Sequence, residues 1–125
     1  MTATIKLANL KTDLEDDVEQ GKQTLAKWAE SFAQNPIHAL SWSRNTFKVA
    51  SEIDIAQRTL AQIANAESNG INAEQVVKQL RFSLTADVLT SAQYVPSSTS
   101  PTSNLMEAEN TAAAARLLAK FAWLM

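Results

Sequence analysis

Apolar side chains recur at helical spacing along most of this chain, and the longest continuous example spans residues 36–68. Successive apolar positions there are four, three, four and three residues apart, which places them on one side of an α-helix. These positions are Val49, Ile53, Ala56, Leu60 and Ile63. Phe47 and Ile55 fall off this stripe, so we expect the helix to be contacted from more than one direction.

The ends of this central segment carry helix-boundary signals. Pro36 suits a first helical position with Asn35 as its cap, and Gly70 followed by Ile71 is typical of a helix end. An unbroken helix over residues 36–68 would be about 50 Å long, whereas a compact globule of this chain length is roughly 35 Å across. We therefore predict either a kink around residues 41–43 or a rod-shaped molecule.

A second amphipathic helix is predicted over residues 12–34. Thr12 and Glu15 have the spacing of a capping box. In residues 1–11, strand-like and helix-like spacings overlap, so we expect a lead-in segment or an early helical turn there. The apolar face of the predicted helix consists of Leu14, Val18, Leu25, Trp28 and Phe32.

A run of acidic residues opens this predicted helix. Negative charge in a first turn complements the helix macrodipole by about 0.3–1 kcal/mol per residue. A calcium loop would need a glycine turn and ligands spread over a dozen positions, so we interpret the run as helix-stabilising charge and expect no metal or other cofactor. The acids are Asp13, Glu15, Asp16 and Asp17.

Gly21 lies on the apolar stripe of the same helix. A glycine inside a helix costs about 1 kcal/mol relative to alanine, which predicts a compensating contact. We therefore interpret Gly21 as a close-packing position and predict that a tryptophan, Trp42 or Trp123, lies over it.

A third helix is predicted from Asn72, its cap, to about residues 91–93, with Gln75 in the capping-box position. Phe82 and Leu89 fall off its apolar stripe, so we expect them to widen the core or to contact another chain. The stripe itself consists of Val76, Val77, Leu80, Leu84 and Val88.

Composition changes sharply over residues 94–104, YVPSSTSPTSN, which predicts an extended linker between a bundle of residues 1–93 and a last helix over 105–125. Asn104 is the predicted cap of that helix, and its second half is apolar on most sides. Such a segment must dock on its own bundle, a second copy, a partner or a membrane surface. The predicted fold is all-α, a single domain formed by an elongated antiparallel three-helix bundle plus a linker-tethered C-terminal helix.

Composition restricts the classes of function. The formal charge of −2 gives no global attraction to nucleic acid or anionic lipid, and the absence of cysteine excludes disulfides and thiolate chemistry. His38 is the only histidine, and neither a glycine-rich phosphate loop nor a Glu-x-x-His pair occurs. We therefore expect that the protein is not an enzyme. Since neither a secretory signal nor a membrane-spanning run of about 20 apolar residues is visible, we expect a cytoplasmic or virion-associated protein.

These patterns favour a structural or adaptor protein that associates with itself or with a larger assembly, such as a virion, through apolar helix faces. The C-terminal helix is the element expected to dock or exchange. The candidate interface residues are Trp42, Phe82, Leu89, Leu117, Leu118, Phe121, Trp123 and Leu124.

The alternative is a small nucleic-acid-binding regulator that uses the third helix. Residues 57–81 have the outline of a helix-turn-helix, and Lys78 and Arg81 supply positive charge. The preceding helix is too long for that motif, however, and Glu74 would face the phosphates where a recognition helix makes its contacts.

Overall fold

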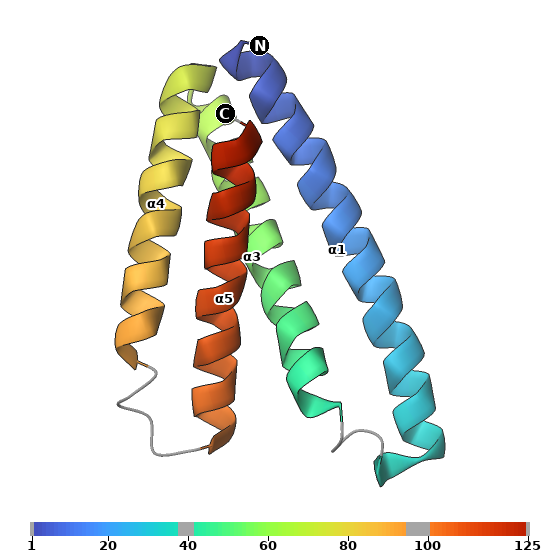
Figure 1. Ribbon diagram of the computed structural model, residues 1–125. Coiled ribbons are helices and arrows are strands. Elements are labelled where there is room, and N and C mark those ends of the chain that lie inside the picture. The colour runs from blue at the N-terminus through green and yellow to red at the C-terminus, as the bar shows by residue number, and fades with distance from the viewer. Residues whose placement is uncertain (1, 38–41, 95–100, 125) are drawn as a thin grey trace.

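The computed structural model describes the backbone of residues 2–37, 42–94 and 101–124, and the surroundings of all their side chains except those of residues 43, 87, 89–94, 101–107 and 121–124. This part of the chain contains no strand, so the all-α prediction is confirmed. The long helices are α1 (Ala3–Gln34), α3 (Ser43–Ser68), α4 (Ala73–Tyr94) and α5 (Pro101–Leu124) (Figure 1).

Successive helices run antiparallel, so that the beginning of α1 and the end of α5 lie at the same end of an elongated molecule (Figure 1). α5 packs against both α4 and α3, and α1 packs mainly against α3, whereas α1 and α5 make few contacts with each other. The C-terminal helix is therefore the fourth member of the bundle.

α1 begins much earlier than predicted. Thr2 is its cap, because the Thr2 hydroxyl accepts a hydrogen bond from the Ile5 N–H at 3.3 Å. The predicted cap, Thr12, lies inside the helix and donates its hydroxyl to the Ala8 carbonyl at 3.2 Å. The prediction of a helix start at Thr12 is therefore wrong, and most of residues 1–11 is helical.

The central helix begins later than predicted. Asn35 is the C-cap of α1, with extended backbone angles of −142° and 93°, and the proline after it disfavours helical geometry there. Trp42 lies in a turn, and α3 starts at Ser43. The prediction of one unbroken helix over residues 36–68 is therefore wrong. The turn at Trp42 falls within residues 41–43, where a kink is the alternative prediction.

The far end of α3 matches its prediction. Gly70 adopts a φ of +73°, a left-handed conformation that glycine reaches without steric cost. The Ile71 N–H then donates to the Ala66 carbonyl at 3.1 Å, which satisfies one of the last carbonyl groups of the helix. Ile71 itself packs, partly buried, against the core.

α4 starts as predicted, whereas α5 does not. The Asn72 carboxamide oxygen accepts from the Gln75 N–H at 3.0 Å, which confirms the predicted cap. α4 continues through Tyr94, and α5 begins at Pro101, where proline suits a first helical position. The prediction that Asn104 caps the last helix is wrong because the helix is already under way there. Residues 95–100 of the predicted linker lie outside the described residues.

The buried core occupies one end of the bundle, which we call the closed end. The closed end contains the first half of α1 and the Gly70 turn. Among the described residues, α1 buries no side chain after Leu14. Away from this end α1 leans away from α5 (Figure 1), and we call the end formed by the last turns of α1 and the first turns of α3 the open end. The buried apolar residues are Leu7, Leu10, Leu14, Ile55, Ala56, Ile63, Ala66, Val76, Val77, Leu80, Leu84, Ala113, Ala114 and Leu117.

α3 is buried on a broader arc than its predicted stripe. Ile55, predicted to point elsewhere, is buried, whereas Val49, Ile53 and Leu60 are only partly buried. This difference arises because α3 contacts both α1 and α5, so its buried surface extends over two sides. Thr59, also buried, satisfies its hydroxyl by donating to the Ile55 carbonyl at 2.8 Å.

Candidate functional site

A half-open groove of about 330 Å³ lies between α1, α3 and α5. Its apolar part is lined by Leu14, Val49, Ile53 and Leu117. The groove follows from the helix arrangement, since α1 and α5 flank α3 but make few contacts with each other. Gly21 lies in its wall, on the face of α1 that looks toward α3.

Isoleucine, not tryptophan, lies over Gly21. A Cβ atom at this position would lie 2.7 Å from Ile53 Cγ1 and 2.9 Å from Ile53 Cδ1, with Val49 Cγ1 at 3.5 Å. The predicted contact with Trp42 is therefore wrong, and the Trp123 side chain lies outside the described residues. Gly21 allows a side chain of α3 to approach the α1 backbone more closely than any other residue would permit.

Ion pairs join α5 to α1 along the groove. Lys120 Nζ lies 2.9 Å from Asp13 Oδ2 and 3.1 Å from Asp17 Oδ2. Burial lowers the pKa of Lys120, but hydrogen bonds to both carboxylates and their negative charge outweigh it, so the pKa is raised above its usual 10.5. Because α1 begins ten residues before Asp13, the interpretation of these acids as first-turn charge is wrong.

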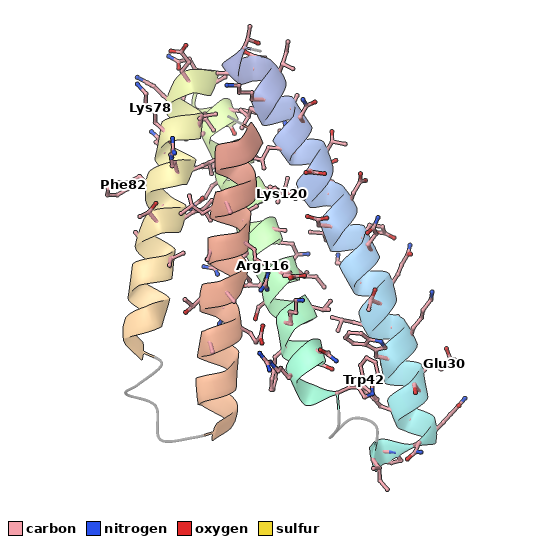
Figure 2. All side chains as sticks on the ribbon, viewed as in Figure 1. Glu30, Trp42, Lys78, Phe82, Arg116 and Lys120 are labelled. Atoms are coloured by element: carbon pink, nitrogen blue, oxygen red, sulfur yellow. The ribbon has the colours of Figure 1, made fainter. Side chains whose placement is uncertain are left out.

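A second ion pair joins α5 to α3, between Arg116 Nη2 and Glu52 Oε1 at 3.0 Å. Figure 2 shows that Arg116 and Lys120 both extend from α5 toward these neighbouring helices. Every charged side chain that lines the groove, Asp17 included, is therefore engaged with another one. Among the described residues, no cluster of three or more potential metal ligands occurs. We interpret the groove and its ion pairs as the connection between α5 and the α1–α3 hairpin, in addition to the packing of α5 against α4.

The open end carries several large apolar side chains, which together we call the aromatic end. The rings of Trp28 and Trp42 are in contact, with centroids 5.5 Å apart and planes tilted by 54°. Trp42 remains 45% exposed and Ile37 73% exposed, although both are large and apolar. We define the aromatic end as Trp28, Phe32, Ile37, Trp42 and Phe47, of which Trp28, Phe32 and Phe47 are partly buried.

The other predicted interface residues divide into three groups. Leu117 lies in the chain's own core and Leu118 packs against it, so this chain itself uses these side chains of α5. Phe82 is 79% exposed and points outward from α4, as Figure 2 shows. The side chains of Leu89, Phe121, Trp123 and Leu124, and all of His38, lie outside the described residues.

Charge is distributed unevenly along the α1–α3 hairpin, which the whole-chain total of −2 conceals. Residues 22–50, around the open end, carry four cations and one acid. Residues 2–21 carry two cations and five acids. Counting charge by segment reveals this asymmetry from sequence alone. The four cations are Lys22, Lys27, Arg44 and Lys48.

Arg44 forms an ion pair within the chain. Its Nε lies 3.3 Å from Glu109 Oε1, and Glu109 is a buried carboxylate of α5. Lys22, Lys27 and Lys48 are exposed and make no ion pair with any described residue. The open end therefore presents unneutralised positive charge beside its apolar side chains.

Comparison of the chain with protein-family models, with curated proteins and with solved structures finds no match. Within the described part of the chain, no helix has both the length and the apolar character that crossing a bilayer requires.

Proposed function

We propose that this protein is a structural or adaptor subunit that associates with itself, or with subunits of a larger assembly, through the aromatic end. The observation that carries the proposal is the exposure of Trp42 and Ile37 at the open end of the bundle. The proposed docking surface is thus the α1–α3 hairpin, because Leu117 and Leu118 of the C-terminal helix are used inside the chain.

Both the apolar area and the residue types of the aromatic end favour association. Burying exposed apolar surface is favourable by about 25 cal/mol per Å², and tryptophan is enriched among the residues that dominate protein interfaces. Trp28 already contacts the ring of Trp42, so the exposed indole is partly ordered before a partner arrives. A side chain held in this way loses less conformational entropy on binding.

Mass measurement over a range of protein concentrations tests the proposal. We expect the wild-type chain to associate as its concentration rises, and the double variant Ile37→Asp/Trp42→Glu to remain a single chain. Phe82→Glu is the matched control, because Phe82 is also large and apolar, and is even more exposed than Ile37 and Trp42, but lies on α4. It should associate like the wild type. A wild-type chain that stays monomeric at every concentration, or a double variant that associates normally, would overturn the proposal.

A second candidate function, nucleic-acid binding, is favoured by the outer surface of α4. Lys78, Arg81 and Phe82 are exposed there, and neither cation pairs with a described acid. Exposed aromatic rings beside cations can stack on bases and contact phosphates. Salt-dependent retention on single-stranded DNA that is lost in Lys78→Glu/Arg81→Glu would favour this candidate, and no retention at low salt would exclude it.

A further inference from the structure

Exposed charges on α1 are mostly acidic before Gly21 and mostly basic after it, with Glu15 among the acids and Glu30 as an exposed acid in the half that leads to the open end. Four of these charges matter most here: Asp16 and Glu19 in the acidic half, and Lys22 and Lys27 in the other half. None of these four forms an ion pair with a described residue. Glu19 instead accepts a hydrogen bond from the Gln23 side chain at 3.2 Å. The two groups are therefore available to another molecule.

The spacing of these charges is self-complementary. Asp16 and Lys27 are eleven positions apart, which is about three helical turns, so they project from the same side of α1. Glu19 and Lys22 are three positions apart and also share a side. Both pairs have their midpoint beside Gly21. A two-fold axis at that level would bring each acid of one helix opposite a base of an antiparallel copy.

Two exposed isoleucines lie near the two ends of α1. Ile5 is 50% exposed near the start of α1, and Ile37 is 73% exposed just beyond its end. Their midpoint in sequence is again Gly21. An antiparallel arrangement therefore brings an exposed isoleucine of each copy toward each end of the interface, and each contact occurs twice because the interface is isologous.

We propose that the partner of the open end is a second copy of this chain, which lies antiparallel along the outer side of α1 so that the basic half of each α1 meets the acidic half of the other. This copy reaches the aromatic end at Ile37, just beyond the end of α1. This inference rests on the proposed function and specifies its partner. A polyanion such as nucleic acid or an anionic membrane would be attracted by Lys22 and Lys27 but repelled by the adjoining acids Asp16 and Glu19. A second copy satisfies both groups at once, which favours it over those partners.

Charge reversal provides the test. The variants Lys22→Glu/Lys27→Glu and Asp16→Lys/Glu19→Lys each place like charges together in a homodimer, so each should dimerise at least tenfold more weakly than the wild type. When the two variants are mixed in equal amounts, opposite charges meet again on both sides of the axis. We expect the mixture to form a dimer of the wild-type mass, measured by sedimentation equilibrium. Lys78→Glu/Arg81→Glu, a reversal on α4, is the matched control and should dimerise like the wild type.

The outcomes separate this inference from the proposed function. If the wild type associates and the aromatic-end variant does not, while both charge reversals behave like the wild type, the aromatic end stands and the antiparallel register is overturned. If the mixture forms particles larger than two chains, the closed two-fold arrangement is overturned. A wild type that never associates overturns both proposals.

Crosslinking gives a second measurement that does not depend on charge variants. Because the chain has no cysteine, a single introduced thiol is the only one present. Gln23 is exposed on the outer side of α1, two positions from the proposed axis, so Gln23→Cys should yield a covalent dimer with a short bis-maleimide. Thr85→Cys, exposed on α4, should not. Equal crosslinking of the two variants would overturn the inference.

Discussion

The closed and open ends of this bundle show how one amphipathic pattern can give two kinds of surface. Leu14 and Leu25 lie on the same stripe of α1, yet Leu14 is 1% exposed whereas Leu25 is only partly buried. Near Leu14, helices from later in the chain complete the packing, while the last turns of α1 lean away from α5 (Figure 1). Periodicity therefore determines which side of a helix faces inward, but the number of neighbouring helices determines how completely that side is covered.

Truncation of these two leucines should show the difference in packing between the closed and open ends most clearly. We expect Leu14→Ala to lower the free energy of unfolding by about 2–5 kcal/mol, because it removes a fully buried side chain and leaves a cavity. Leu25→Ala should cost about 1 kcal/mol, since part of this side chain already contacts water. Urea unfolding followed by circular dichroism measures both. Equal losses would show that the open end is packed as tightly as the closed end.

Gly21, which lies between the two ends, should give the next largest effect. Gly21→Leu should destabilise the fold by about 1–3 kcal/mol, because its side chain would meet Ile53 at a position where even a Cβ atom comes within 2.7 Å. In an Ile53→Ala background the crowding is removed, so Gly21→Ala should stabilise the fold by about 1 kcal/mol through its helix propensity. A double-mutant cycle of Gly21→Ala and Ile53→Ala, measured by thermal unfolding, isolates the contact between these two positions. If the two substitutions have additive effects on stability, this contact is contradicted.

Lys120 should give the smallest effect and a recognisable pH dependence. Its pKa is raised in the folded chain, so the folded state holds this proton more tightly than the unfolded state. The stabilising contribution is therefore complete below about pH 10.5 and is lost as the pH rises through the raised pKa. Near neutral pH, Lys120→Met should cost at most about 1 kcal/mol, as is usual for partly exposed ion pairs.

The pH dependence distinguishes this ion pair from general surface charge. Unfolding measured at several pH values above 9 should show a steeper loss of stability in the wild type than in Lys120→Met. Lys48→Met is the matched control, because Lys48 makes no ion pair with a described residue. The same alkaline loss in wild type and Lys120→Met would contradict the role assigned to Lys120.

Local signals in the sequence account for much of the fold. The Asn72 cap and the Gly70 stop are predicted correctly because each depends on hydrogen bonds or backbone angles within a few residues. Threonine gives a weaker signal, since Thr12 and Thr2 are both acceptable caps and only the wider packing of Leu7 and Leu10 favours the earlier start. The periodicity of residues 36–68 does not indicate the break before α3, and only the excessive length of an unbroken helix suggests a kink there.

The candidate site was less accessible to sequence reasoning because its contacts join distant positions. Nothing local to Asp13 or Asp17 indicates Lys120, which pairs with both from more than a hundred residues away. Ile53 was on the predicted stripe, but the stripe does not specify that this side chain, and not a tryptophan, meets Gly21. The charge asymmetry of the hairpin is different, because it was present in the sequence and needed only counting by segment.

The contact between Trp28 and Trp42 gives the molecule an internal optical probe at the junction of α1 and α3. Replacing Trp123 by phenylalanine would leave these two indoles as the only tryptophans, so fluorescence would report on this junction alone. Local opening of the hairpin would then be seen separately from unfolding of the whole bundle.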